Sequence, residues 1–212
     1  MTSRVCSPRE ELANRLTHGA GLVASVIGSV VLVALATHTG LAAVLAAAVF
    51  GSSLILLYAA STLYHTFRTP SIRQRLRTLD HCAIFVLIAG TYTPITLLGL
   101  KGFLGWGLFG VVWALALAGV IFKLFFMGRF PRISTGIYIA MGWLILVAAR
   151  PAIEALSPAT LAWLLVGGLA YTGGTWFYHH RTLPYAHAIW HLFVLAGSVS
   201  HAIAIGIQVS GS

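Results

Sequence analysis

Seven long apolar stretches leave few folds open to this chain of 212 residues. They cover residues 17–37, 41–66, 81–100, 104–127, 133–150, 158–178 and 184–208. Each is about 20 residues or longer, enough for a helix to cross the roughly 30 Å hydrocarbon layer of a membrane. Only 8% of the residues are charged, and no alternating ten-residue segments of the kind found in a membrane barrel occur. The sequence therefore predicts an all-α polytopic membrane protein with seven transmembrane helices, forming one domain over residues 1–212 with a cytoplasmic tail at 1–15.

The basic residues gather at one set of predicted helix ends. With the N-terminus inside, the outer side carries only Lys101 and Arg150. The eleven basic residues of the inner side are Arg4, Arg9, Arg15, Arg68, Arg73, Arg75, Arg77, Lys123, Arg129, Arg132 and Arg181. This bias follows the positive-inside rule and predicts a cytoplasmic N-terminus and an outer C-terminus. The formal net charge of +9 is then an orientation signal, and we expect no nucleic-acid partner.

Two histidines stand four residues apart in the last apolar stretch. His187 and His191 fall on one face of a helix, one turn apart, where they can bind the same metal ion. On the predicted topology His65 ends the second span, Asp80 begins the third and the histidine pair opens the seventh. All four residues are then at one depth near the cytoplasmic face. Because polar residues are costly in a membrane, they are candidates for function.

Three neutral imidazoles suit Zn²⁺ and leave its fourth coordination position open. An open position permits hydrolysis, in which a nearby carboxylate orients or deprotonates a water molecule. Asp80 is the acidic residue expected here, because Glu10 and Glu11 fall in the predicted tail and Glu154 in an outer loop.

Ser61 precedes His65 by one helical turn and shares its helix face. Its hydroxyl can hydrogen-bond the water, Asp80 or a developing oxyanion. Both residues also have structural interpretations. A serine is common where membrane helices pack, and Asp80 stands where a carboxylate would cap the predicted third helix.

The polar motifs resemble those of the hemolysin III family of bacterial membrane proteins. That family is grouped with the progestin and adipoQ receptors and the alkaline ceramidases as one superfamily of membrane hydrolases. The resemblance covers nearly the whole chain, and a receptor role is not implied, because the long cytoplasmic amino-terminal region of the adiponectin receptors is absent. The matching segments are residues 61–65 (STLYH), 79–81 (LDH), 187–191 (HAIWH), 14–19 (NRLTHG) and 90–94 (GTYTP).

The resemblance implies a seven-helix fold with zinc near the cytoplasmic side. Carried over to this chain, the metal ligands are His65, His187 and His191, with Asp80 reaching the metal through water and Ser61 beside it. It further implies a multi-pass protein of the bacterial inner membrane that hydrolyses a lipid amide or ester bond in membrane-lipid homeostasis, with membrane lipids as partners. The substrate and the oligomeric state stay open.

Two other functions remain as alternatives. The metal could be a structural clasp in a non-enzymatic regulator if Asp80 closed the fourth position. A cytolysin or pore is the other, although no segment carries a periodic polar stripe. Haem is disfavoured, because His187 and His191 share a helix face and cannot be its two opposed axial ligands.

Five further residues carry weaker expectations. His18 should lie behind the metal ligands or contact lipid headgroups, and His201, about 15 Å along the helix from His191, should make a polar contact between helices. Pro94 should kink the third span. The two cysteines, Cys6 and Cys82, should be free thiols.

Overall fold

Helices make up nearly all of the structure. The computed structural model describes residues 7–100, 102–180 and 182–211; Arg4, Cys6, Lys101 and Arg181, used above, lie outside them. The helices are α1 (Pro8–Ala36), α2 (Leu41–Thr66), α3 (Pro70–Pro94), α4 (Gly102–Phe126), α5 (Pro131–Gly142), α6 (Ala149–Ala155), α7 (Pro158–His179) and α8 (Ala186–Val209). A π-helix (Ile95–Leu100) follows α3, and a 3₁₀-helix (Leu144–Ala148) joins α5 to α6. No residue in these ranges forms a strand, so the predicted all-α class is confirmed.

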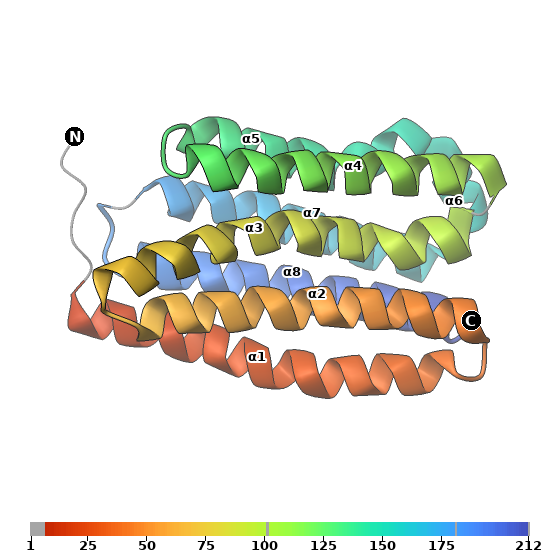
Figure 1. Cartoon of the computed structure of the whole chain (residues 1–212). Helices are drawn as coiled ribbons and strands as arrows, with labels where there is room; N and C mark the ends of the chain where they lie inside the picture. The colour runs from red at the N-terminus through yellow and green to blue at the C-terminus, as the bar shows by residue number, and fades with distance from the viewer. Residues whose placement is uncertain (1–6, 101, 181, 212) are drawn as a thin grey trace.

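The long helices run back and forth along one direction and form a bundle (Figure 1). The start of α1 and the end of α8 lie at opposite ends of this bundle. Helix α1 packs against α2 and α8, α7 packs against α8, and α3 contacts both α2 and α4. The last helix is therefore beside the first, which brings the start of α8 close to the start of α1.

Six helical segments are long and apolar enough to cross a membrane. They are Pro8–Ala36, Leu41–Thr66, Pro70–Leu100, Gly102–Phe126, Pro131–Ala155 and Ala186–Val209. Helix α7 runs along the bundle with the others but is absent from this group. Its 22 residues include glycines, threonines and aromatic residues that lower its hydropathy. The same small residues allow close packing against α8.

Two helices begin well before the positions predicted from hydropathy. Helix α1 starts at Pro8, not near residue 17, and α3 starts at Pro70, not near 81. Ser7 and Glu10 form a capping box at the start of α1: the Ser7 hydroxyl accepts from the Glu10 amide at 3.3 Å, and the Glu10 carboxylate accepts from the Ser7 amide at 2.7 Å. Because α3 starts at Pro70, Asp80 lies inside α3 and is not its N-cap.

The predicted fifth span, residues 133–150, is interrupted after α5. The Tyr92 hydroxyl of α3 donates to the Gly142 carbonyl at 3.0 Å and accepts from the Ile145 amide at 2.8 Å. Backbone groups freed by the interruption thereby keep partners inside the bundle. At the end of α3, the expected disturbance by Pro94 takes the form of a change from α to π winding at Ile95.

The contact between α7 and α8 depends on glycine, and this can be tested. A Cβ atom at Gly174 would lie 2.7 Å from Phe193 Cβ, whereas one at Gly110 in α4 would meet nothing within 4 Å. We expect Gly174→Ala to lower the free energy of unfolding by about 1–3 kcal/mol through this overlap. Gly110→Ala should leave it equal or higher, because alanine favours helices. Thermal unfolding in detergent measures both, and equal stability of the two variants would contradict this account of the packing.

Candidate metal centre

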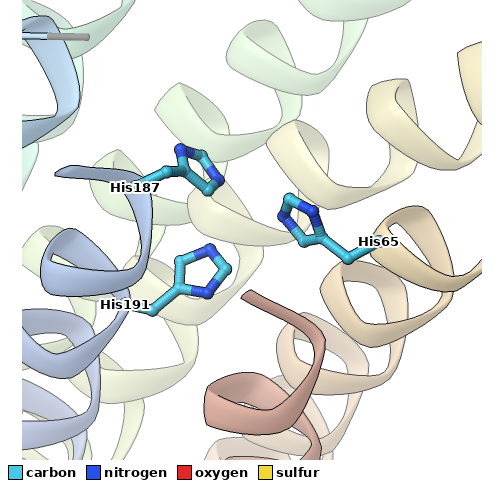
Figure 2. Close-up of side chains that lie close together, drawn as sticks. All are labelled: His65, His187 and His191. Carbon is cyan, nitrogen blue, oxygen red and sulfur yellow. The ribbon is translucent and has the colours of Figure 1, made fainter. Parts of the chain in front are cut away.

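Three histidines from two helices meet at one end of the bundle. His65 lies in the last turn of α2, and His187 and His191 occupy the first two turns of α8. Figure 2 shows the three rings turned toward a common space between the two helices. One nitrogen atom from each ring lies within 4.8 Å of the others, and the ring centroids are 4.6–5.2 Å apart. The three predicted ligands are therefore brought together and can hold a metal ion.

The orientation of His191 is set by α1. The Nδ1 atom of its fully buried ring lies 3.2 Å from the Asn14 carbonyl and 3.1 Å from the Thr17 hydroxyl. Because a carbonyl oxygen can only accept, the bond to Asn14 places a proton on Nδ1. The Nε2 atom then carries a lone pair, which is the form a histidine ligand needs.

The orientation of His65 is set by an acidic residue that the sequence interpretation excluded. Its Nδ1 atom lies 2.8 Å from the Glu11 carboxylate, which also accepts a 2.6 Å hydrogen bond from Arg73. Placing Glu11 in a tail away from the site was wrong, since α1 begins at Pro8 and includes it. A carboxylate behind a ligating histidine fixes the ring and makes it a better donor to the metal.

The preceding residue, Glu10, contacts the start of α8. Its carboxylate accepts a hydrogen bond from the Tyr185 backbone amide at 2.9 Å. Tyr185 has a positive φ of 57°, a strained conformation that persists only where surrounding contacts impose it. The first turn of α8, which carries His187, is thus tied to the first turn of α1.

The donor set fits a metal ion. The Nε2 atoms of His65 and His191 are buried and have no hydrogen-bond partner in the part of the chain that the structure describes. An unsatisfied buried polar atom costs about 1–3 kcal/mol. A cation between the rings would satisfy both atoms at once. Imidazole nitrogen suits zinc, copper, iron and nickel, so the residues alone leave the metal's identity open.

Ser61 and Asp80 lie beside the histidines and are both buried. The Ser61 hydroxyl is hydrogen-bonded to Asp80 and lies 2.7 Å from Nδ1 of His18. The His18 ring stacks on His191 with the centroids 3.5 Å apart. Asp80 is not among the three residues whose donor atoms converge on one point, which agrees with a place outside direct ligation.

An apolar cavity of about 330 Å³ opens beside Asp80 and His18. It extends along the bundle between α3, α5, α7 and α8, and its wall includes Ile88, Leu164 and Val194. This volume is within the range of small-molecule sites, roughly 300–1,000 Å³. His201 also lines it and makes the interhelical contact expected for it, with Nε2 lying 3.2 Å from the Leu164 carbonyl.

Most of the contacts to the histidines that the sequence analysis missed come from α1. One signal could have revealed them: residues 7–10 (SPRE) have the form of a capping box with proline at the first helical position. A helix starting there places Glu11, Asn14 and His18 on one face at spacings of three and four residues. Hydropathy alone does not reveal this face, because the first turn of the helix is polar and falls outside the apolar stretch.

Fold and site together define a multi-pass helical membrane protein with a histidine-rich candidate metal centre at one end of its bundle. Residues 6–202 match the family model described as "Haemolysin-III related". The chain is 47% identical over 199 residues to Hemolysin-3 of Bacillus cereus, covering 93% of this chain and 91% of that protein. It is 46% identical over 193 residues to the Hemolysin-3 homolog of Bacillus subtilis, covering 91% of both chains.

A more distant relative is the human monocyte to macrophage differentiation factor, 30% identical over 207 residues, or 92% of this chain and 83% of that protein. No solved structure matches the chain. The chain belongs to the hemolysin III family, which confirms the resemblance drawn from its motifs.

The hydrogen bond from His65 to Glu11 predicts a measurable effect on metal affinity. Glu11→Gln keeps the shape of the side chain but removes the charge that holds both His65 and Arg73, and we expect metal to bind roughly 10–100-fold more weakly. Competition with a chelator measures the change. Glu154→Gln is the matched control, because Glu154 pairs only with the exposed Arg150 in the described contacts. His191→Ala should abolish binding, and unchanged affinity in Glu11→Gln would refute the role given to Glu11.

Proposed function

We propose that this protein is a zinc-dependent hydrolase that cleaves an amide or ester bond of a membrane lipid and contributes to membrane-lipid homeostasis. The observation that carries the proposal is the group of three histidine donors beside Asp80 and Ser61, together with an apolar cavity that Asp80 and His18 help to line. Zinc bound there would supply Lewis-acid chemistry, polarising the carbonyl group to be cleaved and acidifying a water molecule.

Asp80 is the group suited to move the proton. It would take a proton from the attacking water and return it to the leaving amine or alcohol, so that the acyl group leaves as a carboxylic acid. Ser61 would orient Asp80 through the hydrogen bond between them. When the Ser61 hydroxyl donates to Asp80, its oxygen accepts from Nδ1 of His18, which leaves Nε2 of His18 as an acceptor for a substrate N–H or O–H group.

A lipid substrate is favoured by the position and lining of the cavity. The cavity begins at Asp80 and His18 and continues between apolar side chains along the bundle, where it can take an acyl chain while the bond to be cleaved stays near the histidines. Apolar walls do not suit a water-filled channel, which speaks against the pore alternative. A structural clasp gains less support, because Asp80 bonds to Ser61 and is outside the convergent donor group.

We further propose seven membrane spans, with α7 as the span that the six apolar segments omit, in the inner membrane of a bacterial cell. The N-terminus would be cytoplasmic. Of the basic residues that the structure describes, nine lie toward the end of the bundle with the histidines and one, Arg150, lies toward the other. The positive-inside rule then places the histidine site at the cytoplasmic face.

The hydrolase proposal predicts that Asp80→Asn loses activity without losing metal. We expect fatty-acid release to fall by about 10²–10⁴-fold, the range for removal of a general base. Metal content should stay unchanged, because Asp80 is outside the donor group. The assay gives zinc-loaded protein to panels of phospholipids, ceramides and other acylated lipids, with Glu154→Gln as the control carboxylate variant. A wild-type protein that cleaves no lipid, or an equally active Asp80→Asn, would sink the hydrolase proposal.

The topology predicts opposite accessibility of two connections. In a variant lacking Cys6 and Cys82, His38→Cys in the turn after α1 should react with a membrane-impermeant maleimide on intact spheroplasts. Arg129→Cys, in the turn between α4 and α5, should react only after the membrane is opened. Both native side chains are exposed, so burial will not mask the result. Labelling of Arg129→Cys alone on intact spheroplasts would reverse the proposed orientation.

A further inference from the structure

A second hollow, of about 260 Å³, has His65 in its lining but neither His187 nor His191. Three helices contribute to it: the first two turns of α1, the end of α2 and the first turn of α3, together with the connection between α2 and α3. We call it the arginine pocket. Its lining residues are Pro8, Glu11, Leu12, Arg15, His65, Thr66, Arg68 and Arg73.

Positive charge exceeds negative charge in the arginine pocket. The only carboxylate in its lining, Glu11, is held by Arg73 at 2.6 Å and by His65 at 2.8 Å. Arg15 and Arg68 are exposed and form no salt bridge with any residue in the described ranges. Two guanidinium groups from different elements therefore line one hollow without a counter-ion from the described part of the chain.

This arrangement suits an anion with several oxygen atoms. Each guanidinium presents a planar fork of N–H donors that bonds two oxygens of a phosphate at once, and two forks from different directions can grip one tetrahedral group. The Glu11 carboxylate is already neutralised by Arg73, so it opposes an incoming anion only weakly.

The pocket also lies where membrane phosphates are found. It is formed at the ends of three helices that are long and apolar enough to cross a membrane, and such ends meet the layer of lipid headgroups. Leu12, on the same face of α1 as Arg15, is exposed and gives an apolar edge against which the lipid below its phosphate can pack.

We propose that the arginine pocket binds a phosphate group, supplied either by the headgroup of an anionic membrane lipid or by free phosphate. This site is separate from the metal centre and requires neither bound metal nor hydrolysis. Arg15 and Arg68 are its binding residues. Arg73 borders the site but stays paired with Glu11, so that His65 keeps its orientation when the anion enters.

The test compares two double variants with the same loss of charge. Arg15→Gln with Arg68→Gln removes the pocket's unpaired arginines. Arg75→Gln with Arg132→Gln removes two exposed arginines that are outside the pocket. Binding of phosphatidylglycerol to delipidated protein in neutral detergent is measured by native mass spectrometry. We expect about one tightly bound lipid in the wild type, at least about tenfold weaker binding in the pocket variant and at most about a twofold change in the control.

Inorganic phosphate, titrated by calorimetry, distinguishes the two sources. If phosphatidylglycerol binds tightly and phosphate does not, the pocket takes a lipid headgroup. If phosphate binds alone and competes with the lipid, the pocket takes the free ion. Both outcomes require the pocket arginines. Failure of both probes to bind, or equal losses in the two double variants, would overturn the proposal and reduce the arginines to a general positive surface.

Two controls test whether the pocket variant is misfolded: its metal content and a more conservative substitution. Unchanged metal content in the pocket variant would show that the neighbouring site is intact. Arg68→Lys keeps the charge but loses the fork, and its phosphatidylglycerol affinity should fall several-fold while Arg75→Lys leaves it unchanged. If the double variant does not fold, the comparison of these two lysine variants decides. Because lipid binding is read directly, its result stands whether or not the protein proves to be a hydrolase.

Discussion

The organisation of this end of the bundle depends on two buried nitrogen atoms that have no hydrogen-bond partner in the described structure. The Nε2 atoms of His65 and His191 are kept in that condition by α1, which occupies the opposite nitrogen of each ring. Each unsatisfied buried atom costs about 1–3 kcal/mol, and a bound cation would remove this cost and so favour metal binding. The contacts that keep the two nitrogens unsatisfied are thus the ones that prepare the rings to bind metal. Without α1 the rings could rotate, and their nitrogens could find other partners.

Helix α1 consequently orients the candidate metal ligands although it supplies none of them. Its polar face contacts the end of α2 through Glu11, the start of α3 through the same carboxylate, and the start of α8 through Glu10 and Asn14. These contacts join segments separated by as many as 177 residues. Since α2 and α8 supply all three metal donors, the helix that supplies none of them sets the angle at which the donors meet. A change in the first two turns of α1 should therefore disturb the geometry of the three histidines before it lowers the stability of the whole bundle.

Much of this site could be predicted from spacing, and the missing part has a physical explanation. The pair His187 and His191, and the pair Ser61 and His65, each lie one turn apart on a helix, so local geometry alone put them on shared faces. The apolar stretches then predicted that the end of α2 and the start of α8 lie at the same depth in the membrane. Glu11 escaped because apolar length marks the part of a helix inside the membrane, while α1 and α3 extend past it by polar turns that begin at Pro8 and Pro70. The interruption after α5 was also missed, because the bond from Tyr92 that stabilises it comes from another helix.

The candidate metal centre lies between two unlike environments. On one side, Asp80 and His18 border an apolar cavity that runs along the bundle; on the other, His65 borders a hollow lined by arginines. An amphiphilic molecule is the one kind of ligand for which both environments are favourable, since its chain avoids water while its phosphate or other polar group seeks charge. A water-soluble substrate would gain nothing from the cavity, and a wholly apolar one would gain nothing from the arginines. The placement of the three histidines between the two regions thus argues for chemistry at the polar end of a lipid, where the hydrocarbon layer meets the headgroups.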